Sequence, residues 1–288
     1  MIALTLGMAA YTVNDTMVKL VARELPFGEV VFLRSMLSML ILAAVIGASG
    51  GLRHLGSSAT PMVMLRSLFD ALGTLFFIAA LIHMKIADLS AVVMTSPLIM
   101  TALAALIFGN PVGWRRWSAI GVGLAGTLFI VKPGVGSFDL WALVAVGAAF
   151  FGATRDLATR RIDPTISSLV VGLYGTAAVT LAGAAIGITE SWVFPNREQW
   201  LLIAVAAIFL GLGTYLVVRA FRGVEIAAVA PFRYTLLLWM GIAGFVAFGE
   251  VPDAWALFGA ALIVASGLYT LHREAAAKRA ALAGPPPA

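Results

Sequence analysis

The chain has 288 residues, of which 61% are hydrophobic and 11% are charged, and its formal net charge is +5. A soluble domain carries about 25% charged residues, and so few polar side chains cannot cover the surface of a soluble fold. The composition therefore excludes a soluble protein and indicates a membrane protein with basic loops rather than a nucleic-acid-binding protein. Because the chain has no cysteine, disulfides and thiolate metal sites are excluded.

Apolar stretches long enough to cross a bilayer, about 20 residues each, follow one another along the whole chain. Prolines, glycines and charged residues separate them, and the connections are too short to form a domain outside the membrane. We therefore predict an all-α integral membrane protein with ten transmembrane helices. The helices are expected at residues 2–22, 28–47, 62–83, 86–108, 115–131, 139–159, 166–189, 198–220, 224–248 and 253–271.

The first and sixth helices carry a similar polar pattern in an apolar setting. Asp15 is followed four residues later by Lys19, and Asp156 is followed four residues later by Arg160. Residues at this spacing lie on one face of a helix, so each helix is expected to neutralise its own charge. Two readings stay open: a structural clasp between the two helices, or a pair of gates with one at each mouth of a pathway.

Arg34, Arg66 and Asp70 lie within the second and third helices. Arg34 lies roughly 9 Å into the second helix at 1.5 Å per residue, where a structural and a functional role are equally supported. Arg66 can extend its head group to the interface and can pair with Asp70, one turn later. Pro97, near the middle of the fourth helix, is expected to kink it, either for packing or to line a cavity.

The ninth helix carries the most informative charge. Arg233 lies roughly 14 Å into that helix, near the middle of the bilayer, where a charge costs about 2.5–3.5 kcal/mol. Pro231, two residues before it, frees a backbone carbonyl, which is tolerated at this depth only against protein or water. We therefore expect Arg233 to face a polar cavity and to contact a negative group of a substrate.

Polar and aromatic residues of several helices are candidates for the same cavity. An aromatic ring with a polar tip can contact an organic solute and still find a hydrogen-bond partner. The candidate substrate-binding residues are Arg233, Asn14, Tyr234, Arg155, Arg34, Asp70, Trp239 and Tyr11; the candidate gating residues are Asp15, Lys19, Asp156 and Arg160; and the candidate kinks are Pro97 and Pro231.

The distribution of basic residues predicts the orientation. With the N-terminus in the cytoplasm, inside loops and tail hold nine Lys or Arg residues and outside loops hold four. The positive-inside rule therefore places both termini in the cytoplasm. Residues 275–288, which end in Pro-Pro-Pro-Ala, are expected to be a cytoplasmic tail that begins as a frayed helix and is then disordered.

The chain also repeats itself. The segment "LGTLFF" at 72–77 matches "LGTYLV" at 212–217, and Phe-Gly at 108–109 matches Phe-Gly at 248–249, each 140 residues later. We therefore predict two five-helix repeats, at 1–134 and 135–274. Because five is odd, the second copy enters the membrane inverted, around a central cavity, as in many secondary transporters. Duplication of a stable bundle with no transport role is the alternative.

These features resemble the drug/metabolite transporter superfamily, EamA type. The resemblance rests on the inverted repeat, on "FGE" at 248–250 followed by "WALFGAALIVASGLY", and on "FGN" at 108–110 followed by "WSAIGVGLAGTLFIV". The first half has Asn where the family usually has Glu. The resemblance covers nearly the whole chain and implies ten helices, a central cavity, and transport of amino acids, riboflavin, S-adenosylmethionine or other metabolites.

We therefore expect a secondary-active transporter for an amino-acid-like, zwitterionic or polar-aromatic metabolite in a bacterial cytoplasmic (inner) membrane. An intramembrane enzyme would need clustered nucleophiles, bases or ligands, and a channel would need a ring of like charges or a carbonyl filter; the sequence has neither pattern. A multidrug or cation exporter is the alternative among transporters. We expect no cofactor, no metal and no nucleic-acid partner, and a monomer or weak homodimer; coupling to protons or to a counter-solute stays open.

Overall fold

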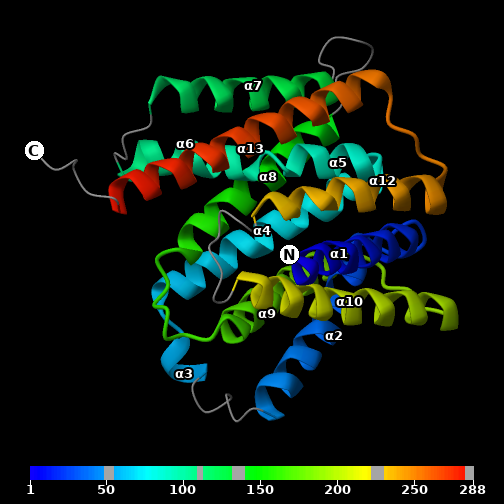
Figure 1. The fold of residues 1–288 in the computed structure, drawn as a ribbon. Helices are drawn as coiled ribbons and strands as arrows, with labels where there is room; N and C mark the ends of the chain where they lie inside the picture. The colour runs from blue at the N-terminus through cyan, green and yellow to red at the C-terminus, as the bar shows by residue number, and fades with distance from the viewer. Residues whose placement is uncertain (49–54, 109–112, 132–139, 222–229, 283–288) are drawn as a thin grey trace, which may run out of the picture.

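The computed structural model describes residues 1–48, 55–108, 113–131, 140–221 and 230–282. All regular elements in these ranges are helical (Figure 1). The elements from residues 1–131 are α1 (Ile2–Val21), α2 (Phe27–Ala48), α3 (Leu55–Ser58), α4 (Pro61–His83), α5 (Ile86–Val93), α6 (Ser96–Phe108) and α7 (Trp114–Val131). Those from residues 140–282 are α8 (Leu140–Thr159), α9 (Ser168–Gly187), α10 (Arg197–Phe221), η2 (Ala230–Tyr234), α12 (Thr235–Phe248) and α13 (Ala254–Leu282).

The described helices are those of a multi-pass membrane protein. Seven segments are long and apolar enough to cross a bilayer, and two shorter apolar helices, at 117–131 and 232–248, accompany them. Large apolar side chains lie exposed along the helices, as expected for surfaces that face lipid. The seven segments are residues 27–48, 61–83, 86–107, 140–159, 168–187, 197–217 and 254–273.

The most extensive helix pairings join an early helix to a late one. These pairings are α1 with α10, α4 with α8, α2 with α9, and α7 with α13. In Figure 1 most helices run across the view, with α7 and α13 together along the upper edge. Gly126 and Gly259 allow this close pairing, because a Cβ at either position would meet the backbone oxygen of the other.

The predicted fourth helix is interrupted where Pro97 was expected to act. α5 ends at Val93 and α6 begins at Ser96, so the helix breaks between them. Pro97 has no N–H to offer the carbonyl of Val93, four residues earlier. The Ser96 hydroxyl lies 2.7 Å from that carbonyl oxygen and 3.0 Å from the carbonyl oxygen of Ala149 on α8. The break is therefore stabilised by hydrogen bonding and tied to the neighbouring helix.

The last helix extends into the segment at 275–288, which was expected to be a frayed helix followed by a disordered tail. α13 continues to Leu282, because the run "REAAAKRAAL" consists of strong helix formers with no glycine or proline. The remaining residues, 283–288, lie outside the described part of the chain.

Candidate functional site

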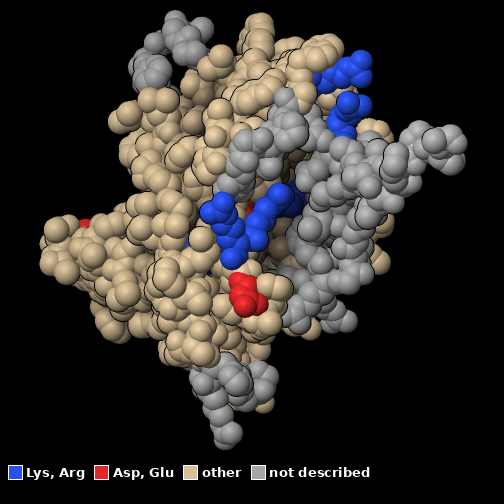
Figure 2. Space-filling model, turned by 90° about the vertical axis from the view of Figure 1, so that its left-hand side faces the viewer, with Lys and Arg blue, Asp and Glu red and all other residues tan. Residues whose placement is uncertain are grey.

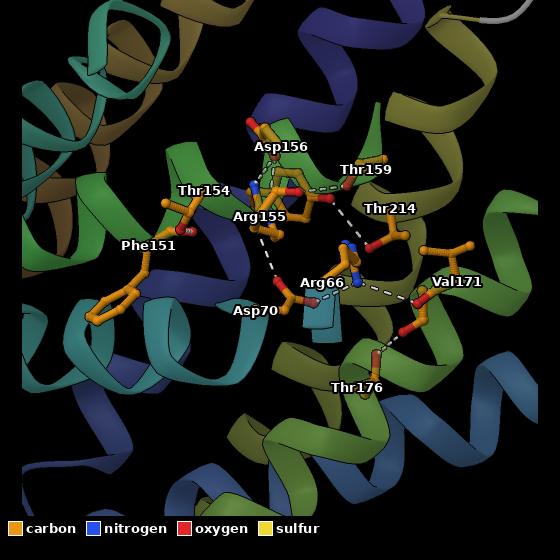
Figure 3. Close-up of polar contacts among 12 residues, drawn as sticks. Arg66, Asp70, Phe151, Thr154, Arg155, Asp156, Thr159, Val171, Thr176 and Thr214 are labelled. Atoms are coloured by element: carbon orange, nitrogen blue, oxygen red, sulfur yellow. Dashed lines mark hydrogen bonds and ion pairs between the residues drawn. The ribbon is translucent and has the colours of Figure 1, made fainter. Parts of the chain in front are cut away.

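Charged side chains from several helices meet in the interior, in what we call the central charge cluster (Arg66, Asp70, Arg155, Asp156 and Arg233). Arg155 on α8 is its hub (Figure 3). Its Nη1 donates to Asp70 Oδ1 at 3.1 Å, and its Nε and Nη2 donate to Asp156 Oδ1 at 3.0 and 2.9 Å. One guanidinium therefore holds a carboxylate of its own helix and a carboxylate of α4.

The second oxygen of Asp70 is bound from its own helix. Arg66 Nη1 donates to Asp70 Oδ2 at 3.0 Å and to the carbonyl oxygen of Val171 on α9 at 3.3 Å. The i,i+4 pair predicted from the spacing of these residues is therefore present. Gly175 on α9 makes room for it, because a Cβ at that position would collide with Arg66 Nη1 and Asp70 Oδ2.

Arg233 is the loosely held cation of the cluster. Its Nη1 lies 3.8 Å from Asp156 Oδ2, too far for a hydrogen bond. Its side chain is 35% exposed, more than those of Arg155 (32%) and Asp156 (28%). The residue lies in η2, a 3-10 segment that directly precedes α12. The irregular backbone predicted beside Pro231 is therefore found at Arg233, and none of the described residues accepts a hydrogen bond from its guanidinium.

A tyrosine and a threonine lie beside this cluster. The Tyr11 hydroxyl on α1 lies 3.3 Å from the Thr214 hydroxyl on α10, and Tyr11 is close enough to Asp70, Arg155 and Arg233 to interact with them electrostatically. Sequence reasoning named Tyr11 but missed Thr214, because a single threonine in an apolar helix has no distinguishing signal. The pair adds hydroxyl groups to a site dominated by charges.

A second polar group lies deeper in the helix bundle. The Asn14 amide donates to Asp15 Oδ1 at 2.7 Å and accepts from Arg34 Nη1 at 3.3 Å. Arg34 is 5% exposed, and its Nε has no hydrogen-bond partner among the described residues. Asp15 and Asp70 both attract its charge. Asn14 therefore links an acid and a base that do not pair directly.

Taken together, these two groups carry more positive than negative charge. They contain four guanidinium groups, which stay protonated at any workable pH, and three carboxylates. The excess of one positive charge lies in the central charge cluster, where Arg233 has the longest contact with a carboxylate. The arginines are Arg34, Arg66, Arg155 and Arg233, and the acids are Asp15, Asp70 and Asp156.

The i,i+4 charge pairs predicted for the first and sixth helices, Asp15–Lys19 and Asp156–Arg160, are wrong. Lys19 binds Glu250 at 2.6 Å rather than Asp15, and Asp156 pairs with Arg155 and Arg233 rather than with Arg160, which is exposed. Helical spacing places two side chains on one face, but a long side chain follows the best partner in space.

Lys19 belongs to a separate group, in the last turn of α1; the ends of α1 and α12 lie at the right of Figure 1. The Lys19 side chain is 5% exposed, and its ammonium donates to Glu250 Oε1 and to the carbonyl oxygen of Met84, both at 2.6 Å. The other carboxylate oxygen, Glu250 Oε2, accepts the N–H of Ile86 at 2.9 Å, at the start of α5. Four segments therefore meet at one lysine–glutamate pair: α1, the α4–α5 connection, α5 and the end of α12.

The "FGE" sequence gives this group its geometry. Gly249 ends α12 in the left-handed conformation, with φ 64°, which a glycine adopts without steric cost. That turn directs Glu250 back towards α1. The Phe248 ring lies 4.9 Å from Lys19 Nζ and 5.0 Å from the Arg23 guanidinium, as cation–π contacts require. The corresponding "FGN" at 108–110 extends beyond the described residues.

The two remaining aromatic candidates lie around the end of η2 and in α12. The Tyr234 hydroxyl abuts Gly267 of α13 and has no hydrogen-bond partner among the described residues, and the same holds for Trp239 Nε1. Trp239 packs with Tyr11 against Leu4 and the neighbouring residues of α1. Both rings are placed by helix packing, and neither joins the hydrogen bonds of the central charge cluster.

A hollow at the edge of the molecule is separate from these groups. It has a volume of about 440 Å³ and is lined by residues of α3 and of the α8–α9 connection. Asp163 is the charged residue of its lining, which otherwise consists of hydroxyl and apolar side chains. The hollow contains one charged residue, whereas the central charge cluster contains five that form ion pairs with one another. We therefore place the candidate site at the central charge cluster.

Figure 2 looks onto the end of the molecule at the left of Figure 1. Lys and Arg side chains gather near the middle of this face and again towards its upper right. The start of α7 and the end of α8 lie at this end (Figure 1), and Arg115, Arg160 and Arg161 there are exposed. This end of the molecule is therefore basic.

Comparison with known proteins agrees with this arrangement of helices and charges. The chain is 28% identical over 261 residues to the pseudopaline exporter of Pseudomonas aeruginosa, covering 90% of this chain and 91% of the relative. It is 27% identical to the riboflavin transporter of Vibrio cholerae (94% and 92% covered) and to the S-adenosylmethionine uptake transporter of Rickettsia bellii (93% and 92% covered).

A solved crystal structure has the same fold, with a TM-score of 0.64 at 20% identity, covering 94% of this chain and 96% of the other. The model of the EamA-like transporter family matches residues 1–132 and 139–271, which together make up most of the chain. These matches identify a transporter rather than an enzyme, as the resemblance implied. The chain belongs to the EamA-like transporter family.

Proposed function

We propose that this protein is a secondary-active transporter of a small organic metabolite, and that it works by alternating access between two inverted five-helix repeats. The family supports transport, and the relatives named above are a pseudopaline exporter, a riboflavin transporter and an S-adenosylmethionine uptake transporter. Ten spanning helices, two repeats at 1–134 and 135–274, and cytoplasmic termini in an inner membrane complete the proposal.

The helix contacts support the inverted repeat. If α1, α2, α4, α5–α6 and α7 correspond in order to α8, α9, α10, η2–α12 and α13, exchanging the halves turns the α1–α10 pairing into the α8–α4 pairing. The α2–α9 and α7–α13 pairings map onto themselves. A pseudo-twofold axis between the halves would produce this pattern, and such an axis supplies two states with opposite exposure.

The single observation that carries the substrate class is the position of Arg233. It lies beside a well-bound carboxylate without a hydrogen bond to it, and its side chain is among the most exposed of the cluster. A planar guanidinium matches a carboxylate with two parallel hydrogen bonds. We infer that Arg233 binds an acidic group of the substrate, while Asp156 holds the guanidinium in place.

The rest of the site suits a substrate that also carries polar or positive groups. Asp15 can attract an amino group, and Tyr11 can lie against an aromatic part. An amino-acid-like, zwitterionic or polar-aromatic metabolite fits both the excess positive charge and these neighbours. A purely cationic drug fits less well, since four arginines repel it.

The proposal is tested in two steps. Purified protein is first screened against a metabolite library by thermal shift, since a ligand at 100 times its Kd adds about 2.7 kcal/mol of stability. The ligands found are then followed in liposomes. Saturable counterflow of the labelled ligand supports the proposal, whereas an ohmic conductance without counterflow identifies a channel and contradicts it.

A further inference from the structure

We propose that the Lys19–Glu250 pair is the closure of the outer side of the transport pathway, and that it must break each time the site opens to that side. This inference rests on the proposed function, because it names the part of the alternating-access cycle that this pair controls. It assigns a role to Glu250, which no sequence argument paired with Lys19.

The first support is the position of the pair at the end of the bundle. Lys19 lies near the end of α1, and Glu250 follows the end of α12, so the pair joins two helices at their termini. It lies at the end of the molecule opposite the basic face of Figure 2. By the proposed orientation this is the outer end.

The second support is the number of segments that the pair connects. Glu250 accepts from Lys19 and from the N–H of Ile86, and Lys19 also donates to the carbonyl oxygen of Met84. α1 packs most extensively against α10, whereas α12 packs against α1 and α5. Breaking the pair therefore removes the charged and hydrogen-bonded link between the end of α1, the connection between α4 and α5, and the end of α12.

The third support is the contrast in exposure between the two ends. The Lys19 and Glu250 side chains are 5% and 16% exposed, whereas Arg155 and Arg233 of the central charge cluster are 32% and 35% exposed. The site is therefore more accessible than the pair. The counterpart of Lys19 in the second half, Arg160, is exposed. In the described state, the Lys19–Glu250 ion pair joins the segments at one end of the molecule. At the other end, Arg160 does not pair with Asp156, the acid predicted for it.

The sequence adds an asymmetry between the halves. A shift of 140 residues relates Glu250 to Asn110, so the position that carries a carboxylate in the second half carries a neutral amide in the first. An amide accepts a hydrogen bond but adds no charge to attract a basic partner. We therefore expect the outer closure to be the stronger one, and the resting protein to be closed outside.

The test measures distance at the outer end rather than transport. Because the chain has no cysteine, spin labels can be attached only at the substitutions Leu201→Cys on α10 and Val251→Cys after α12, both at exposed positions. Pulsed electron paramagnetic resonance spectroscopy then gives the distribution of distances between the two labels, in the otherwise native protein and in the Glu250→Gln variant. The glutamine keeps an acceptor for the Ile86 N–H and loses the charge.

We expect Glu250→Gln to add a longer distance that the native protein lacks. Lys19→Met removes the other partner of the same ion pair and should add the same longer distance. The double variant should populate that distance no more than either single variant does. Glu198→Gln removes an exposed carboxylate of α10 and should leave the distribution unchanged. Unchanged distributions in folded Glu250→Gln and Lys19→Met overturn the inference, and so does unfolding of both, since the pair would then be a folding requirement.

Failure of this inference is distinct from failure of the proposed function. If the native protein shows saturable counterflow and Glu250→Gln shows no new distance, transport stands and the closure is wrong. If the native protein shows no counterflow with any ligand that binds it while the new distance appears, the closure opens and the transport proposal is wrong.

Discussion

Arg155 on α8 donates to Asp70 on α4 at 3.1 Å, and these two residues come from different halves of the chain. The contact fixes the position of the Arg155 guanidinium, which in turn holds Asp156 beside Arg233. The order of the acids and bases is therefore set by packing between the halves. Arg233 is the last residue in this series of contacts, and its contact with Asp156 is the longest of them.

Replacing Arg233 with lysine should spare folding and reduce transport. The lysine keeps the positive charge near Asp156, but its ammonium cannot form the paired hydrogen bonds that a guanidinium gives to a carboxylate. Loss of one charge-assisted hydrogen bond, about 1.5–3 kcal/mol, corresponds to roughly a 10- to 100-fold loss of affinity. Counterflow in liposomes measures the loss of transport in Arg233→Lys, and the ligand-induced thermal shift measures the loss of affinity.

Arg115→Lys is the matched control, because Arg115 is exposed at the start of α7. It should behave like the native protein. If Arg233→Lys transports like the native protein while Arg233→Ala fails to fold, Arg233 holds the structure together and does not bind the substrate.

Replacing Gly175 with alanine should disturb the central charge cluster without adding or removing a charge. The new Cβ would collide with Arg66 Nη1 and Asp70 Oδ2, so the Arg66–Asp70 pair must shift away from α9. Forcing an extra carbon into a packed contact typically costs about 1–3 kcal/mol. Thermal unfolding in detergent should show this loss, together with weaker ligand binding.

Gly172 lies about one turn before Gly175 on the same helix and provides the control. Its Cβ would meet only a methyl group of Thr214 at 3.9 Å, an ordinary contact. Gly172→Ala should therefore be close to native in stability. Equal effects of the two substitutions would mean that helix flexibility rather than the ion pair explains the result.

Replacing Ser96 with alanine should destabilise the protein at the interruption between α5 and α6. The hydroxyl lies 2.7 Å from the Val93 carbonyl oxygen, which Pro97 leaves without an N–H, and 3.0 Å from the carbonyl oxygen of Ala149 on α8. A typical hydrogen bond contributes about 1 kcal/mol, so Ser96→Ala should lower the free energy of unfolding by roughly that amount. Ser118→Ala, which removes an exposed hydroxyl from α7, should change stability little.

Both termini should face the cytoplasm. The substitutions Gly136→Cys and Ala280→Cys introduce single thiols on opposite sides of the proposed membrane. An impermeant thiol reagent added to intact cells should label position 136 and leave position 280 unlabelled until the membrane is opened. The reverse pattern would invert the orientation, and with it the side that the Lys19–Glu250 pair closes.

Local sequence signals predicted where most helices begin and end. α4 was expected at 62–83 and runs from Pro61 to His83, and α7 was expected at 115–131 and runs from Trp114 to Val131. Hydropathy and turn residues are local properties, so they define a helix without knowledge of its neighbours. The interruption of the fourth helix follows from the same kind of signal, because a proline removes its own N–H wherever it stands.

Partners in space could not be predicted in the same way. The Arg66–Asp70 pair follows from spacing alone, but Lys19 reaches past Asp15 to Glu250, 231 residues later in the chain. A lysine side chain is long and flexible, so its partner depends on which helices pack together. The hub role of Arg155 and the participation of Thr214 depend on the same tertiary packing.

The interleaving of the two halves has a consequence for biosynthesis. The most extensive pairings of α1, α2, α4 and α7 are all with helices that follow residue 139. While the ribosome is still making the second half, Lys19 and Asp70 are already in the membrane without Glu250 and Arg155, their later partners. The nascent first half must therefore persist as a set of inserted but incompletely assembled helices, and assembly is completed only when α13, the partner of α7, has been synthesised.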